Sequence, residues 1–213
     1  MYEVTHSGAW LPVSAWGDSE AWNRLIGWIN NNCQNVGARL IITPKLTDQL
    51  NSPDGLRAFA RYAARVDARG NGPGCRWEAG DGPIIVVWPE ELTVQNCVRT
   101  VAGLPQQLII VLEQAVLGAH SFQGWACAVG AYNAETGDHE HPNPDLDEQL
   151  DAILTSFENE LMGPPRAGLL REKLHEVCVG GFDEDFVVTY AIALGYQGDV
   201  GRLRRHYSAA RQN

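Results

Sequence analysis

Four charged residues each follow a short apolar run of the chain: Lys45, Glu90, Glu91 and Glu113. If the three runs are neighbouring parallel strands, their carboxyl ends share one edge of a sheet, which is where open α/β sheets bind ligands. Carboxylates that lie close together have pKa values that move apart, so that one can act as an acid and the other as a base. These four residues are therefore the candidate pocket if the protein is an enzyme of unrecognised type.

His139 and His141 are the core of a second group that could do chemistry. Alternate residues of an extended segment point to the same side, so the two imidazoles could bind a borderline metal ion such as zinc or nickel. Asp138, Asp145 or His120 would supply a further ligand. The competing interpretation, which we favour, is a linker that is polar because it is exposed to solvent. No cofactor is predicted.

Arg202, Arg204, Arg205 and Tyr207 are the candidate contacts to nucleic acid. They lie in the second of two helical segments that are joined by a short turn with two glycines, and these proportions resemble a helix-turn-helix. Asp199 argues against this interpretation, because it stands where a recognition helix would first meet DNA. The alternative is a helical bundle whose last helix carries arginines near its C-terminal end, where they match the helix dipole.

Signatures of the common catalytic sites are missing from the sequence. No G-x-G-x-x-G or G-x-x-x-x-G-K-[ST] motif follows an apolar run, so a phosphate-nucleotide site is not predicted. Residues 109–112 followed by Glu113 resemble the strand that presents an acidic Mg²⁺ ligand in P-loop ATPases, but the phosphate loop of that family is lacking. Ser121 follows His120 without the G-x-S-x-G elbow of hydrolases. The five cysteines form no C-x-x-C motif and are expected to be buried, reduced thiols.

The elements that would position these residues follow from the spacing of apolar side chains. Runs rich in β-branched residues occupy 40–42, 84–88 and 108–112, and continuous apolarity is typical of strands buried on both faces. Segments with helical spacing separate the runs, and alternating strands and helices indicate βαβ units. The predicted fold class is α/β, with a small, mostly parallel sheet of three or more strands flanked by helices and followed by a C-terminal helical subdomain.

The chain divides into three parts on this interpretation. Residues 1–37 are expected to form an extended N-terminal arm and one helix, residues 38–138 the α/β core, and residues 144–213 the C-terminal helical subdomain. A polar linker separates the last two parts, as is usual at a domain boundary.

One helix of the predicted core would begin near Pro53 and carry a row of arginines. Arg57, Arg61, Arg65 and Arg69 recur every four residues, which places them on one side of a helix. Such a row is typical of a solvated face whose aliphatic stems cover apolar surface, and contact with phosphates is the alternative.

Charge and hydropathy restrict the function further. The net charge is −10, and residues 81–162 hold one arginine against thirteen acidic residues. This acidity discourages nonspecific binding to nucleic acid or to an anionic membrane. No apolar run approaches the roughly 20 residues that cross a bilayer, and the first residues lack a signal-peptide pattern. We therefore expect a cytoplasmic protein that does not bind membranes.

The leading functional hypothesis is a non-catalytic interaction or accessory role, with another protein or a second copy in a homodimer as the partner. It is motivated by the missing catalytic signatures and by the four tryptophans in the first 28 residues, since tryptophan is enriched at interfaces. The alternatives are a DNA-binding accessory or regulatory protein that uses residues 199–211, and an enzyme with a site at the carboxyl ends of the strands.

Overall fold

The computed structural model describes residues 2–46, 50, 53–69, 82–104, 107–113, 121–158 and 164–212, without the side chains of 158 and 164–170. Within this part of the chain the strands are β1 (Ser7–Leu11), β2 (Leu40–Thr43), β3 (Ala64–Asp67), β4 (Ile84–Val87), β5 (Leu108–Leu112) and β6 (Tyr132–Asn133). The α-helices are α1 (Ser19–Asn32), α2 (Asp54–Ala60), α3 (Glu91–Val101), α4 (Gln123–Val129), α5 (Pro144–Glu158), α6 (Pro164–Val179), α7 (Glu184–Ala193) and α8 (Val200–Arg211). Short 3-10 helices occupy Val13–Ala15 and Val36–Ala38.

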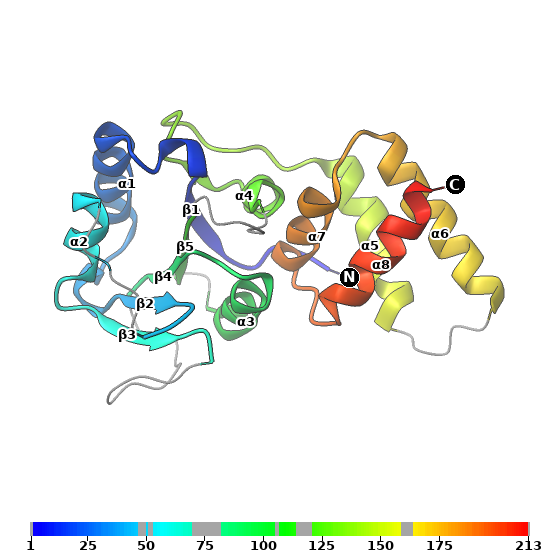
Figure 1. Cartoon of the computed structure of the whole chain (residues 1–213), viewed down its shortest axis with the longest axis horizontal. Helices are drawn as coiled ribbons and strands as arrows, with labels where there is room; N and C mark the ends of the chain where they lie inside the picture. The colour runs from blue at the N-terminus through cyan, green and yellow to red at the C-terminus, as the bar shows by residue number, and fades with distance from the viewer. Residues whose placement is uncertain are drawn as a thin grey trace.

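The six strands form one parallel sheet in the order β3-β2-β4-β5-β1-β6. Helices α1 and α2 cover one face, α3 and α4 cover the other, and α5 to α8 lie beyond α3 and α4 (Figure 1). The predicted α/β class, the parallel sheet and the helical C-terminal part are therefore confirmed. Strands with helices on both faces must be apolar throughout, and this is why 40–42, 84–87 and 108–112 were readable from sequence.

The strand β1 is the main difference from the expected fold. An extended N-terminal arm is expected from the sequence at the start of residues 1–37, whereas Ser7–Leu11 pairs with both β5 and β6 inside the sheet. Gly8 explains why the strand is hard to recognise. A Cβ at this position would lie 2.2 Å from the carbonyl oxygen of Ile109 and 2.7 Å from the ring of Trp125. Close packing of α4 on β1 thus requires glycine in a position where a strand usually carries an apolar side chain.

The arginine row is the second difference. Helix α2 ends at Ala60, and residues 64–67 form the edge strand β3 instead of two further helical turns. Tyr62 has a φ of 60°, which breaks the helix, and the Arg39 side chain donates hydrogen bonds to the carbonyl oxygens of Phe59 (2.7 Å) and Arg61. Those carbonyls would otherwise lack partners at the helix end. The contact with Arg39, which is distant in the sequence, therefore ends the helix. The predicted row of arginines along one helix face does not form.

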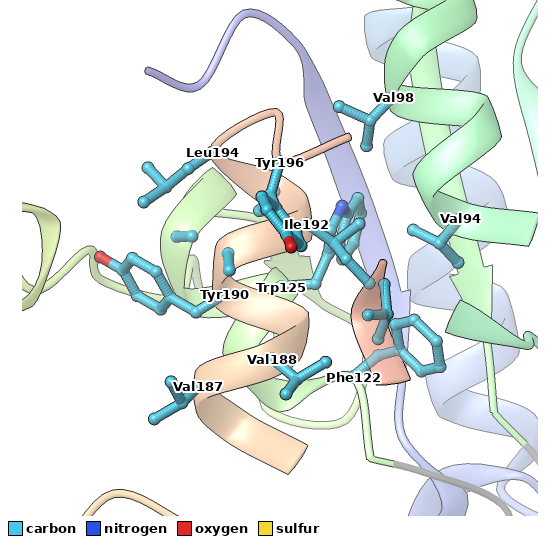
Figure 2. Close-up of a cluster of buried hydrophobic side chains, with 14 of the residues drawn as sticks. Val94, Val98, Phe122, Trp125, Val187, Val188, Tyr190, Ile192, Leu194 and Tyr196 are labelled. Carbon is cyan, nitrogen blue, oxygen red and sulfur yellow. The ribbon is translucent and has the colours of Figure 1, made fainter. Parts of the chain in front are cut away.

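The helical part is joined to the α/β part by a continuous apolar core. Val94 and Val98 from α3, Phe122 and Trp125 at α4, and a set from α7 and the turn that follows it face one another (Figure 2). That set comprises Val187, Val188, Tyr190, Ile192, Leu194 and Tyr196. At the centre of this contact the buried side chain of Gln95 on α3 donates hydrogen bonds to the carbonyl oxygens of Tyr196 (2.8 Å) and Gly198 (3.0 Å).

None of the helices in the described part of the chain has the length and apolarity that a membrane span requires.

Candidate functional site at the carboxyl edge of the sheet

The carboxyl edge of the sheet gathers three of the four residues of the candidate pocket around the ends of β4 and β5. Glu113 follows β5 directly, and Glu90 and Glu91 stand at the start of α3, one turn after β4. Lys45 follows β2 and is exposed. The parallel sheet places these residues at one edge, as the sequence predicted, but their surroundings differ sharply.

Glu113 is a buried carboxyl group at the centre of this edge. Its side chain accepts a hydrogen bond from the N–H of Phe122, and its own N–H donates to the carbonyl oxygen of Leu11 at 3.0 Å. Burial raises the pKa of Glu113, and the nearby charge of Asp185 raises it further. The N–H of Phe122, the indole of Trp10 and the N–H of Val13 act in the opposite direction. A buried carboxyl group with a raised pKa is a frequent feature of functional sites.

We expect Glu113→Gln to stabilise the protein at pH 8. Because burial raises the folded-state pKa above the ordinary 4.5, the ionised carboxylate costs stability above the folded pKa, and protonation relieves that cost as the pH falls. The amide oxygen of glutamine can still accept the Phe122 N–H. Urea denaturation of both proteins between pH 8 and pH 4.5 should show an advantage for Glu113→Gln that shrinks towards pH 4.5. The exposed neighbour Glu90→Gln is the control and should change stability by less than about 0.5 kcal/mol. A Glu113→Gln variant that is less stable at pH 8 would contradict a carboxylate whose burial costs more than its hydrogen bonds return.

Arg204 of α8 forms an ion-pair network at the same edge. Its guanidinium donates to Glu91 (Nε to Oε1, 2.9 Å), to Glu184 (Nη1 to Oε1, 2.7 Å) and to Asp185 (Nη2 to Oδ1, 2.7 Å). The side chains of Arg204 and Glu91 are only 17% and 13% exposed. Burial alone would lower the pKa of Arg204, but the hydrogen bonds to these carboxylates outweigh it and raise the pKa. The network joins α8 to the starts of α3 and α7.

Three helix starts of the described structure, those of α1, α7 and α8, carry an aspartate as their own hydrogen-bond acceptor. The Asp18 carboxylate accepts from the N–H of Glu20 (2.8 Å) at α1, Asp183 from Phe186 (2.7 Å) at α7, and Asp199 from Arg202 (3.1 Å) at α8. Asp199, the acid that argued against a DNA-binding helix, is thus the N-cap of α8. Anions bind helix starts through free N–H groups and the positive end of the dipole. At the sheet edge, Asp18 at α1 and Glu113 at α4 already accept such N–H groups, and although no side chain caps α3, Glu91 lies in its first turn. The edge therefore suits a phosphate group poorly.

Aromatic and aliphatic side chains are the other component of this edge. Trp88 follows β4 with a φ of 54°, which an L-residue rarely adopts, and its N–H donates to the carbonyl oxygen of Leu112 at 2.9 Å. The rings of Trp16 and Trp88 have centroids 6.5 Å apart, and both side chains are half-buried. Strained backbone conformations of this kind concentrate at functional sites.

The candidate nucleic-acid contacts are largely engaged within the protein. Tyr207 is 1% exposed and donates its hydroxyl hydrogen to the carbonyl oxygen of Phe182, and Arg204 belongs to the ion-pair network. Arg202 lies over the ring of Phe157, 5.7 Å from its centroid. Of the four, only Arg205 is extensively exposed, at 70%, with Asp199 at 3.5 Å. A helix-turn-helix function would therefore have to rely on Arg202 and Arg205.

The candidate metal ligands do not form a ligand set in the described structure. The Nδ1–H of His139 donates a hydrogen bond to the carbonyl oxygen of Gly130 (2.8 Å), and its ring contacts Trp28 and Tyr132 edge-on. Among the described residues no group of three His, Cys, Asp or Glu side chains could hold a metal ion, and His120 lies outside them. Packing against two aromatic rings gives His139 a structural role.

Cys127 and Ser121 lack the surroundings of a nucleophile. Burial raises the pKa of Cys127 to about 12, and the negative charge of Glu140, 3.5 Å from the sulfur, adds to this effect. A thiol with such a pKa is protonated and unreactive near neutral pH. The N–H of Ser121 lies 3.4 Å from a carboxylate oxygen of Asp185, so this residue contributes its backbone to the acidic edge.

The main feature that sequence reasoning missed is the pairing of Glu91 with Arg204. The sequence analysis placed these residues in two separate candidate sites, a catalytic pocket and a nucleic-acid contact. They are 113 positions apart, and no local pattern connects them. The start of α7 is recognisable from the sequence by its acids Asp183, Glu184 and Asp185, which match the helix dipole. The sequence does not show that Arg204 is the partner of Glu184 and Asp185.

The chain matches no family model, no curated protein sequence and no solved structure.

Proposed function

We propose that this protein is a non-catalytic module that binds another protein. The observation that carries the proposal is the network of Arg204 with Glu91, Glu184 and Asp185. The network lies at the edge where α/β sheets bind small ligands. Its carboxylates pair with Arg204, the cation that a phosphate or carboxylate ligand would need. Carboxylates of the chain also fill the starts of α1 and α7 at or beside this edge.

The aromatic surface beside the network supports the same proposal. Trp16 and Trp88 are half-buried, and Val13 and Leu92 are 41% and 64% exposed. Tryptophan is enriched at protein interfaces, where it supplies a large share of the binding energy. An edge whose cation Arg204 is already paired with carboxylates of the chain, and which has accessible aromatic side chains, is better suited to a protein than to a nucleotide.

Ligand binding and turnover distinguish this proposal from an enzyme. Melting curves with ATP–Mg²⁺, GTP–Mg²⁺ and NAD should match the curve of the protein alone. A nucleotide present at a hundred times its Kd would add about 2.7 kcal/mol of stability, which a melting curve detects easily. Nucleotide-dependent stabilisation or hydrolysis that Glu113→Gln abolishes would overturn the proposal.

The proposal also predicts a positive result, which is a complex of known composition. Light scattering gives the mass of the purified protein, and partners recovered from the native host are expressed and mixed with it as pure components. A stoichiometric complex, or a stable homodimer, is the expected result. A protein that stays monomeric and forms no complex with any of those pure components would contradict an interaction role.

A further inference from the structure

Four apolar side chains are accessible around the ends of β1 and β4: Val13, Trp16, Trp88 and Leu92. We call them the Trp88 surface. Val13 and Trp16 lie in the connection from β1 to α1, while Trp88 and Leu92 lie between β4 and the first turn of α3. The ring centroids of Trp16 and Trp88 are 6.5 Å apart, so the two connections meet at these rings. Large apolar side chains that converge in this way mark interaction sites more often than scattered ones do.

The backbone at Trp88 shows that the ring is held in place at a conformational cost. A φ of 54° is rare for a residue with a large side chain. Glycine or asparagine would adopt it with less strain. The N–H of Trp88 is fixed to Leu112 and Pro89 follows, so the indole lies half-buried beside Trp16, with its ring nitrogen buried. Strain of this kind at an edge rich in apolar side chains favours a binding role.

The charges around the Trp88 surface are mainly negative. Glu90 is exposed next to it, and the side chain of Glu20 at the start of α1 is 79% exposed. Arg24 and Arg204 offset part of this charge through ion pairs. From 81 to 162 the sequence holds one basic residue, Arg99, which lies in the last turn of α3, away from this edge.

Two further positive side chains, Lys45 and Arg65, lie on the other side of the edge. Lys45 follows β2, and the guanidinium of Arg65 on β3 donates to the hydroxyl of Thr43 at 3.2 Å. The Trp88 surface is therefore bordered by acids at α1 and α3 and by cations beyond β2. A partner segment that lies across the ends of β4, β5 and β1 meets carboxylates.

We infer that the Trp88 surface is the docking site of a basic protein segment with apolar anchor residues. The inference rests on the proposed function and names the surface and the chemistry of the partner. The anchors would bury Trp88 and Leu92, and lysine or arginine side chains beside them would face Glu90 and Glu20. Charge complementarity of this type accelerates association and excludes acidic partners.

Nuclear magnetic resonance with synthetic peptides tests the inference directly. The probe is a peptide of lysines and leucines, compared with a glutamate–leucine peptide and a lysine–serine peptide. The indole N–H signals of the seven tryptophans are the readout. The lysine–leucine peptide should shift the signals of Trp16 and Trp88 and leave that of the fully buried Trp125 unchanged. The binding should weaken as salt screens the charges.

Substitutions with matched controls locate the contact. Trp88→Asn removes the indole ring, and asparagine tolerates the positive φ at this position. Leu92→Ser removes an exposed apolar side chain. Tyr62→Asn is the control for the first, because Tyr62 is 86% exposed and has a φ of 60°, and Val179→Ser is the control for the second, because Val179 is 73% exposed. Trp88→Asn should weaken peptide binding at least about 30-fold, as expected of a hot spot, and both controls should leave it unchanged.

The outcomes separate this inference from the proposed function. Equal binding of the acidic peptide, no binding of the lysine–leucine peptide, or binding that Trp88→Asn leaves intact would overturn the docking site. If a reconstituted protein complex nevertheless forms and resists Trp88→Asn, the interaction role stands and uses another surface. If no such complex forms, the proposed function fails with it.

Discussion

Arg204→Ala is expected to lower the free energy of unfolding by about 3–5 kcal/mol, the usual cost of removing one partner from a buried ion pair. The substitution leaves Glu91, Glu184 and Asp185 without their common cation, and the Glu91 side chain is 13% exposed and thus poorly solvated. Three helices, α3, α7 and α8, meet at this guanidinium. The loss should therefore loosen the contact between the sheet and the helical part.

Arg205→Ala is the matched control for that substitution. It removes an arginine from the next position of the same helix, but Arg205 is 70% exposed and its contact with Asp199 is long, at 3.5 Å. Exposed pairs of this kind contribute little, so a change below about 0.5 kcal/mol is expected. Urea denaturation followed by tryptophan fluorescence gives both values.

A double-mutant cycle identifies the source of the loss. The cycle combines Arg204→Ala with Glu91→Gln and should show a coupling of about 0.5–3 kcal/mol, because the two side chains share one network. Equal effects of Arg204→Ala and Arg205→Ala on the free energy of unfolding, with no coupling to Glu91, would show that the network does not stabilise the contact between the sheet and the helical part.

Gly124→Ala is the second substitution with a large expected effect. A Cβ at position 124 would lie 1.9 Å from the carbonyl oxygen of Phe186 and 2.8 Å from the hydroxyl of Thr189. The first of these atoms belongs to the backbone of α7, so α7 must move away from α4 to make room. Overpacking of this kind costs about 1–3 kcal/mol and sometimes more. It outweighs the gain of up to about 1 kcal/mol that alanine brings to a helix.

Gly27→Ala gives a control with the opposite sign. Gly27 lies inside α1, and a Cβ there would meet nothing within 4 Å. Alanine should therefore stabilise the protein by about 0.8–1 kcal/mol through helix propensity alone. Near-ultraviolet circular dichroism should change for Gly124→Ala, because Trp125 lies in the same contact (Figure 2), and stay the same for Gly27→Ala. If Gly124→Ala also stabilises the protein, then α4 and α7 do not approach as closely as the structure shows.

The sequence by itself determined the class of the fold and most of its elements. Strands buried on both faces must be apolar over their whole length, so β2, β4 and β5 were visible as runs. Helical spacing and capping residues likewise identified α3, α4 and the four C-terminal helices, because these signals act within a few residues of one another. The parallel arrangement followed from the alternation of the two kinds of element.

The tertiary structure decided the features that depend on contacts between distant residues. β1 carries a glycine because the backbone of β5 and the ring of Trp125 on α4 both lie against it, and that requirement of space hides the strand from any local pattern. α2 ends where Arg39, about twenty positions earlier, binds its last carbonyls, so β3 could form in place of a longer helix.

The candidate site shows the same division. The sequence placed Glu90, Glu91 and Glu113 at strand ends, since the direction of a parallel strand fixes which edge its last residue reaches. It could not show that Arg204 returns from α8 to neutralise Glu91, because that ion pair exists only once the helical part packs on the sheet. Packing of distant elements, which leaves no periodic trace in the chain, brought Arg204 to Glu91, a residue of the predicted pocket.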